Sequence, residues 1–405
     1  MTPLDSRTPF VGKQVDLIAR REGLKERLAS KGFDAALISY HRDVLYYTGT
    51  AQPANLLVFS GRDPILFVRR AFDLASEDTG GGLELVHAPS FAAVQEALSS
   101  LEGPGHRLGV ALDVMPAGHL RRLESMLPDW MVDNVSPLVL AQRAIKQPCE
   151  IEALEHAAAL SSIAYETIIG SLTPGISPVE LAAEVGRALR RRGVEENVFF
   201  RRWDAWLPSS GIFAAGDEAA IISGHAMTVT GTGVSQALPW GPSRRPIGRG
   251  EVVYVDIGLN LAGYHTDFTR SYVAGRADSQ ASELFDIVKR AQEAAIGALQ
   301  PGAPANATMR AAQEVVASAG VAGNFQGYGD KQGDYVGHGV GLELDERPTL
   351  TSKEEWPLEV NMCLAVETKL IMPEWGGIGI EDTLILEDHG PRLLTRLPRE
   401  LIEVE

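Results

Sequence analysis

The sequence is poor in cysteine, in long apolar runs and in basic residues. Its two cysteines, Cys149 and Cys363, are too few for a disulfide framework and are typical of a reducing compartment. No stretch approaches the roughly 18 uninterrupted apolar residues of a membrane-spanning helix, and the first 23 residues lack the apolar segment of a secretory leader. We therefore expect a cytoplasmic protein with no membrane partner.

Acidic residues outnumber basic ones. The chain has 53 Asp and Glu against 37 Lys and Arg, a formal net charge of −16. This charge argues against nucleic acid or an anionic membrane as a partner, because both are polyanions. The hydrophobic share of 45% is ordinary for a globular protein, and 405 residues suffice for two domains. We therefore expect no nucleic-acid partner.

Short apolar segments alternate with helical periods in the first 140 residues, which predicts an α/β layer structure. Later in the chain, Ser177, Pro178 and Glu180 combine an N-cap, a first-turn proline and a capping-box glutamate. The expected strands lie at 35–39, 55–60 and 64–68, and the expected helices at 15–31, 91–101, 149–171, 278–299 and 304–319, with one more beginning after Ser177.

Five residues with oxygen or nitrogen donors stand in apolar or glycine-rich frames of the C-terminal half. Donor sets without thiolate suit hard to borderline divalent ions such as Mn²⁺, Fe²⁺, Co²⁺ or Zn²⁺. Four carboxylates are too many for one catalytic ion and suit two ions about 3.5–4 Å apart, with a nucleophilic hydroxide between them. The five are Asp256, Asp267, His338, Glu367 and Glu381.

The spacing of these residues supports a metal site on a sheet. Asp267 follows Asp256 by eleven positions, and a turn at 261–263 would fold this segment into a hairpin with both carboxylates at one end. Glu367 and Glu381 stand in apolar strands, where an unpaired carboxylate is costly and a cation makes it tolerable. Any one of these acids alone is more often a surface or turn residue, so the complete set carries the prediction.

At these motifs the chain resembles the pita-bread metallopeptidase superfamily, which includes aminopeptidase P, prolidase, methionine aminopeptidase and creatinase. The shared signature is an aspartate, a second aspartate in a GY-x-x-D-x-T-R context, a Gly-His-Gly histidine, and two glutamates. In this sequence the signature is found at Asp256, GYHTDFTR (263–270), GHG (337–339), Glu367 and IEDT (380–383).

The resemblance covers nearly the whole chain, since residues 20–50 and 142–161 are similar to the starts of the family's two domains. It implies a creatinase/prolidase-like α/β domain at 1–140 and an α+β pita-bread catalytic domain at 141–405. It also implies that Asp256 and Glu381 hold one ion, that Asp267 bridges, and that His338 and Glu367 complete the second. Glu367 would in addition relay the proton. Manganese is the expected metal, with cobalt, zinc or iron as alternatives. The resemblance further implies a small peptide or small molecule as the substrate and a homodimer as the assembly.

Three positions near the signature depart from the family pattern. Trp240 and Asp345 stand where histidines are usual, and Gly379 stands where prolidases tend to have an arginine. We therefore predict a rewritten substrate pocket containing Trp240, Asp345 and His265. His265 or His225 is a candidate to supply a missing imidazole, although a structural or surface role is the more common one for a single histidine.

The leading functional hypothesis is a dinuclear metal-dependent hydrolase of short peptides, of the Xaa-Pro dipeptidase or aminopeptidase type, in which Glu367 and His338 are catalytic and the nucleophile is a metal-bridging hydroxide. The alternative is a pita-bread hydrolase or lyase that acts on a small non-peptide metabolite, which the changed pocket residues allow. A non-catalytic binding protein is the third class. Retention of all five metal donors argues against it.

Overall fold

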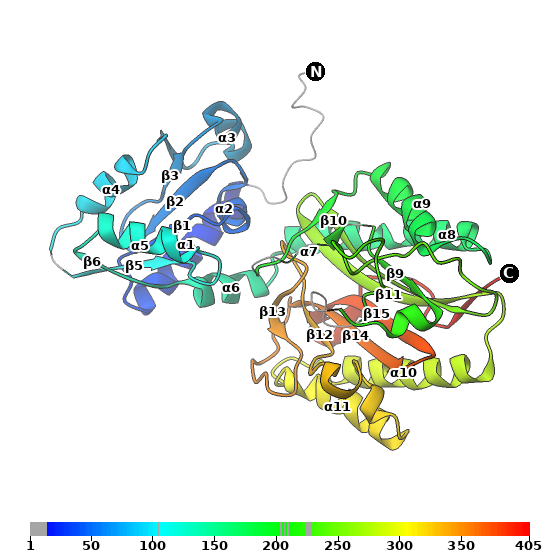
Figure 1. Ribbon diagram of the computed structural model, residues 1–405. Coiled ribbons are helices and arrows are strands. Elements are labelled where there is room, and N and C mark those ends of the chain that lie inside the picture. The colour runs from blue at the N-terminus through cyan, green and yellow to red at the C-terminus, as the bar shows by residue number, and fades with distance from the viewer. Residues whose placement is uncertain (1–13, 104, 203–204, 206, 209, 224–228) are drawn as a thin grey trace. The chain divides into compact units, whose positions relative to one another are not determined.

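The computed structural model describes residues 14–103, 105–202, 205, 207–208, 210–223 and 229–405 (Figure 1). The chain divides into two compact units. The first unit runs to Arg143 and also includes Arg201 from later in the chain, and the second contains the remainder from Ala144 onward. None of the described helices is both long enough and apolar enough to cross a membrane.

The first unit contains a six-stranded mixed sheet in the order β4-β3-β2-β1-β5-β6. β1 is antiparallel to β2 and parallel to β5, so the strands change direction near the middle of the sheet. The strands are β1 (Ala35–Ile38), β2 (Ala54–Phe59), β3 (Ile65–Val68), β4 (Glu84–His87), β5 (His106–Val110) and β6 (Trp130–Asn134).

Helices pack against this sheet, and the α/β architecture expected for the N-terminal part is confirmed. Its apolar core contains Leu37, Leu57 and Leu108 from the strands and Val94 and Leu98 from a helix, all buried. The helices are α1 (Gln14–Ser30), α2 (His41–Thr48), α3 (Phe72–Thr79), α4 (Ala92–Ser99), α5 (Ala117–Met126) and α6 (Ser136–Ala144).

A buried charge cluster in the first unit includes a residue from far along the chain. The Asp43 side chain is fully buried and accepts hydrogen bonds from Arg143 Nη1 at 2.7 Å and from Arg201 Nη1 at 3.0 Å. Arg201 Nε also donates to Asp113 Oδ2 at 2.6 Å. The cations compensate carboxylates that would be costly to bury alone.

The second unit contains a nine-stranded sheet in the order β13-β12-β14-β15-β11-β10-β9, to which β16 adds at β15 and β17 at β11. A separate short pair joins β7 (Asn197–Val198) to β8 (Leu207–Pro208). The sheet strands are β9 (Ile212–Ala215), β10 (Val252–Leu261), β11 (Tyr264–Ala274), β12 (Gly337–Gly339), β13 (Glu346–Thr349), β14 (Cys363–Met372), β15 (Gly376–Glu387), β16 (Gly390–Leu393) and β17 (Ile402–Val404).

Strands β10 and β11 form the hairpin that the sequence predicts. Its two-residue loop has positive φ at Ala262 (50°) and Gly263 (85°), the conformation of a type I′ turn that suits twisted strands. The predicted position of the carboxylates within the hairpin is wrong in one respect. Asp256 faces Thr269 and Asp267 faces Gly258, so both acids lie near the middle of the long strands rather than at one end.

Helices cover one face of the sheet, as Figure 1 shows for α8 and α9 near β10 and for α10 near β14. The apolar strand residues that pack on them alternate with polar residues on the opposite face. The helices are α7 (Pro148–Ala159), α8 (Ser161–Ser171), α9 (Pro178–Arg190), α10 (Ser279–Gly297) and α11 (Asn306–Ser318), and the 3₁₀ turns are η2 (Gly216–Ala220), η3 (Ala322–Asn324) and η4 (Gly329–Lys331).

The start of α9 is as predicted, because Ser177 and Glu180 form a capping box. The single helix expected from Cys149 to Ser171 is instead two helices that meet at Leu160. The hydroxyls of Ser161 and Ser162 donate to the carbonyl oxygens of Ala158 and Ala159, at 2.6 and 2.9 Å. Such side-chain bonds compete with the helical backbone ladder and favour a break.

Candidate metal centre

The five predicted donors lie on five adjacent strands of the second sheet, in the order β12-β14-β15-β11-β10. Four of them share the face opposite the helices: Asp256 on β10, Asp267 on β11, Glu367 on β14 and Glu381 on β15. Glu367 faces Glu381 across the β14–β15 ladder, and Glu381 faces Thr269, which is two residues beyond Asp267. Because side chains two residues apart point to the same face of a strand, this register brings the carboxylates together.

Three of the five donors converge most closely. Asp267, His338 and Glu381 each offer a ligand atom, and these atoms lie within 4.8 Å of one another. His338 Nε2 is 3.8 Å from Asp267 Oδ2 and 3.7 Å from Glu367 Oε1. Three protein ligands and an open position are the usual arrangement around a catalytic zinc-type ion.

Unsatisfied carboxylate oxygens show that this group fits a cation. Asp267 Oδ1 and Glu381 Oε1 are buried and have no hydrogen-bond partner among the described residues. Burial, with nearby carboxylates adding to it, raises the pKa of both acids well above the ordinary range. A divalent ion between them would supply the missing partner for each oxygen and offset the like-charge repulsion.

The Gly-His-Gly motif holds the imidazole in a narrow gap. A side chain at Gly337 would collide with the carbonyl oxygen of Ala365, and one at Gly339 with that of Arg347. His338 Nδ1 lies 3.0 Å from the carbonyl oxygen of Gly339, to which it donates when Nε2 is the unprotonated ligand atom. The glycines therefore let two strands approach closely on either side of the histidine.

At His338, nearby carboxylates and burial act on the pKa of the imidazole in opposite directions. Burial alone lowers the pKa of this imidazole, but Asp345, Glu367 and Asp267 outweigh that effect and raise the pKa above its usual value. A divalent ion at Nε2 would therefore compete with a proton for this nitrogen.

Asp256 and Glu367 are arranged around a lysine that the sequence reasoning missed. The buried Lys369 Nζ forms a close ion pair with Glu367 Oε2 and lies 3.7 Å from Asp256 Oδ2. Tyr254 Oη donates to the same Asp256 oxygen at 3.2 Å. Its position two residues after Glu367 places both side chains on the same face of β14, but this spacing does not show that the amine is buried.

Two threonines fix the carboxylates that converge. Thr269 Oγ1 donates to Glu381 Oε2 at 2.8 Å. Thr383 Oγ1 accepts from the backbone N–H of Asp267 at 2.9 Å and donates to its carbonyl oxygen at 2.8 Å. The Thr383 hydroxyl thus takes the place of ladder hydrogen bonds at Asp267, because the register between the described residues of β11 and β15 pairs Thr269 with Glu381 and does not extend to Asp267.

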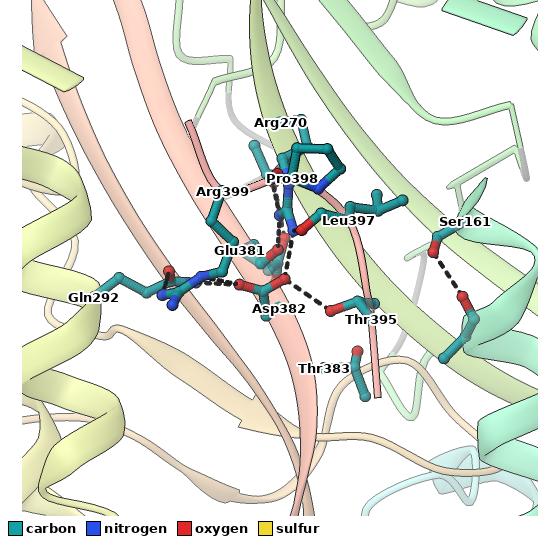
Figure 2. Close-up of polar contacts among 12 residues, drawn as sticks. Ser161, Arg270, Gln292, Glu381, Asp382, Thr383, Thr395, Leu397, Pro398 and Arg399 are labelled. Carbon is teal, nitrogen blue, oxygen red and sulfur yellow. Dashed lines mark hydrogen bonds and ion pairs between the residues drawn. The ribbon is translucent and has the colours of Figure 1, made fainter. Parts of the chain in front are cut away.

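Figure 2 shows a second polar network next to Glu381, centred on the buried Asp382. Arg270 Nη2 pairs with Asp382 Oδ1 at 2.6 Å, and Arg270 Nη1 donates to the carbonyl oxygen of Glu381 at 2.6 Å. Thr395 donates to Asp382 Oδ1 at 2.8 Å, while Gln292 and Arg399 donate to its other oxygen at 3.2 and 3.1 Å. This network holds the strand segment that presents Glu381.

A cavity of about 420 Å³ opens beside His338. Its volume lies in the range of small-molecule pockets. Three aspartates are among its lining residues, which are Asp330, Lys331, Gln332, Gly333, Asp334, Tyr335, Gly337, His338, Asp345, Thr349 and Thr351. Asp345, one of the predicted pocket residues, therefore shares a cavity wall with His338.

His265 and Trp240, the other two predicted pocket residues, lie away from the cavity wall. His265 is fully buried, with Nε2 accepting from the Phe199 backbone N–H at 3.1 Å and Nδ1 lying 3.0 Å from the Gly341 carbonyl oxygen. Trp240 is buried in the segment before β10. Neither is among the described residues that line the cavity. His225 lies outside the described residues.

Comparisons with known proteins agree with the two-unit fold. Residues 152–388 match the model of metallopeptidase family M24, and residues 20–145 match the creatinase/prolidase N-terminal domain. The chain is 27% identical to an Xaa-Pro dipeptidase of Pyrococcus horikoshii, over 93% of this chain and 97% of that one. It is 28% identical to an uncharacterized peptidase of Bacillus subtilis, over 94% and 99%.

Solved structures show the same likeness. The prolidase of Pyrococcus horikoshii superposes with a TM-score of 0.80 at 25% identity, covering 95% of this chain and all of that one. The expected combination of a creatinase-type α/β domain and a pita-bread domain is confirmed. The chain belongs to metallopeptidase family M24 and is a hydrolase of the metallopeptidase type.

Proposed function

We propose that the protein hydrolyses short peptides at a divalent-metal centre on the second sheet, with Xaa-Pro dipeptides as the first substrate class. The carrying observation is the convergence of Asp267, His338 and Glu381 beside a cavity of dipeptide size. Dipeptidase and prolidase relatives that align over almost the whole chain support the substrate class. Manganese is the proposed metal.

A bound divalent ion supplies a more acidic water and polarises the scissile carbonyl. The chain's own residues hold that ion and handle the protons. His338 and the carboxylates of Asp267 and Glu381 are the closest donors, and the number of ions depends on Lys369, whose amine lies beside Glu367 and Asp256.

Glu367 is the proposed proton carrier. Its Oε1 faces His338 Nε2 at 3.7 Å, so this carboxylate lies at the edge of the metal centre. We propose that it accepts a proton from the attacking water and delivers it to the nitrogen of the departing amine. General acid–base catalysis of this kind contributes about 10²–10⁴-fold in rate.

The cavity favours a substrate with a free amino group. Asp330, Asp334 and Asp345 contribute three carboxylates to the wall and Lys331 only one ammonium. Asp345 is close enough to His338 to raise the pKa of that imidazole. A peptide N-terminus near Asp345 would complement this charge.

The alternative is a small cationic metabolite as substrate, for hydrolysis or elimination. The acidic cavity wall favours it, together with the replacement of the usual pocket histidines by Trp240 and Asp345 and of the usual arginine by Gly379. These replacements remove groups that would hold an ordinary peptide in the prolidase manner. A single substrate screen can decide between the two classes.

The experiment is an assay of metal-reconstituted protein against a panel of Xaa-Pro dipeptides, other dipeptides and cationic metabolites. We expect hydrolysis of at least one dipeptide, its loss after chelation and its recovery with Mn²⁺. Asp267→Asn and Glu381→Gln should abolish turnover and sharply reduce bound metal, whereas Glu251→Gln, on a partly exposed ion pair, serves as the matched control. Turnover of metabolites alone would refute the peptide class.

The roles of the pocket residues have a separate test. The Trp240→His, Asp345→His double variant restores imidazoles at both departing positions. We expect it to change the ranking of substrates across the same panel. An unchanged ranking would show that these two positions do not set specificity.

We also propose a homodimer and a cytoplasmic location, on the basis of the sequence expectations above. Sedimentation equilibrium of the purified protein tests the first, and fractionation of the source cells tests the second. A monomer at micromolar concentration, or recovery outside the cytoplasm, would contradict these proposals.

A further inference from the structure

Lys369 is an unusual residue to find on the ligand-bearing face of the sheet. Its side chain is 2% exposed and belongs to β14, two residues beyond Glu367. Lysine is rarely buried unless its charge is compensated. Compensation comes from the carboxylates of Glu367 and Asp256, and the Nζ atom also lies 5.8 Å from the centre of the Tyr254 ring.

The strand opposite makes room for this lysine. Lys369 faces Gly379 across the β14–β15 ladder. A Cβ atom added at Gly379 would lie 3.1 Å from Lys369 Cγ and 2.8 Å from Tyr254 Cε2. The second distance is closer than real Cβ contacts allow. The absence of a side chain at Gly379 on β15 therefore leaves the room that the Lys369 side chain on β14 occupies beside Tyr254.

The amine divides the five donors into two groups. Asp267, His338 and Glu381 have ligand atoms within 4.8 Å of one another, and two of their oxygens have no partner among the described residues. Glu367 and Asp256 instead have Lys369 Nζ between them, in close contact with the first and 3.7 Å from the second. An ion held by Asp256 would lie beside this ammonium and be repelled by it.

We propose that Lys369 is a built-in cation that takes the place of a second metal ion, so that the chain binds one catalytic ion, at Asp267, His338 and Glu381. This inference refines the ion count expected from the sequence and rests on the proposed metal-dependent function. The single ion retains three protein ligands and an open coordination position, as catalytic sites require.

The experiment measures metal content and needs no turnover. Full-length protein is stripped with a chelator, dialysed against excess Mn²⁺ and analysed for manganese per chain, with electron paramagnetic resonance of the same sample. We expect one ion per chain and the spectrum of an isolated Mn²⁺. Two ions per chain with an exchange-coupled spectrum in the unaltered protein would overturn the inference while leaving the metal-dependent function intact.

Substitutions at Lys369 sharpen the result. Lys369→Met removes the charge and should raise the manganese content from one to two ions per chain, whereas Lys369→Arg keeps the charge and should remain at one. Lys146→Met is the matched control, because it removes another buried lysine whose partner is Glu346, at 2.8 Å, and should also remain at one. Circular dichroism verifies that each variant is folded.

The remaining outcomes are also decisive. A folded Lys369→Met protein that still binds one ion would overturn the role of the lysine. An unaltered protein that binds no manganese, nor zinc or cobalt in parallel samples, would overturn this inference and the proposed metal-dependent function together.

Discussion

The contribution of the Asp382 network to the stability of the second unit can be measured with a single substitution. Replacing Asp382 by asparagine keeps its shape but removes its negative charge. Arg270, which is fully buried, would keep its backbone carbonyl partners and lose its 2.6 Å ion pair, and Arg399 would face the same neutral amide. The asparagine NH₂ group would also point at donors instead of accepting from them.

The expected cost follows from breaking a buried ion pair at one end. Removal of one partner typically costs about 3–5 kcal/mol, since the other charge remains buried without compensation. The control is Glu251→Gln, where the pair with Arg245 is about one-third exposed and its loss should cost less than about 1 kcal/mol.

Urea unfolding followed by tryptophan fluorescence and by circular dichroism can measure both variants, with the two probes compared because a two-unit chain need not unfold in one step. We expect a clear drop in the midpoint of the second unit for Asp382→Asn and almost none for Glu251→Gln. Equal stability of the two variants would refute the reasoning that Arg270 depends on this carboxylate.

Three further predictions concern the site itself. Thr383→Val leaves the N–H and C=O of Asp267 unpaired and should cost about 2–4 kcal/mol in urea unfolding, whereas Thr383→Ser should cost about 1 kcal/mol; equal costs would contradict the hydroxyl's role. Glu367→Gln should lower kcat far more than it raises KM in steady-state assays, and a defect in KM alone would exclude proton transfer by Glu367. The pKa values of Asp267 and His338 are both raised, so the metal-free protein should lose stability as pH rises, because folding favours the protonated form of each group. The increase in Tm on metal loading should therefore become larger between about pH 5.5 and 8. An increase in Tm that becomes smaller over this range would contradict both pKa shifts.

Much of the ligand-bearing sheet could be predicted because its residues alternate strongly. The apolar faces of β10, β11, β14 and β15 and the glycine at position 263 indicated strands and a tight hairpin, and the structure has both. The position of the acids within the hairpin was not predictable from spacing, because it depends on how far each strand continues past its carboxylate.

The burial of Lys369, in contrast, could not be predicted from the sequence. A lysine in a strand usually reads as a solvent-facing residue, and only the strands that pack around it reveal that its amine is buried between acids. The same limit applies to the break at Leu160, where serine hydroxyls compete with a helix that periodicity alone extends, and to His265, whose ring is held by the backbones of two distant segments.

Arg201 gives the first unit a property that bears on protein engineering. A fragment that ends at Arg143 contains Asp43 and Asp113 but lacks the guanidinium that contacts both of them. In such a fragment Asp43 would keep Arg143 but lose its second guanidinium, and Asp113 would lose its 2.6 Å partner, so the N-terminal unit is not a self-contained segment. Chimeras that exchange this unit between relatives therefore need to exchange residue 201 with it.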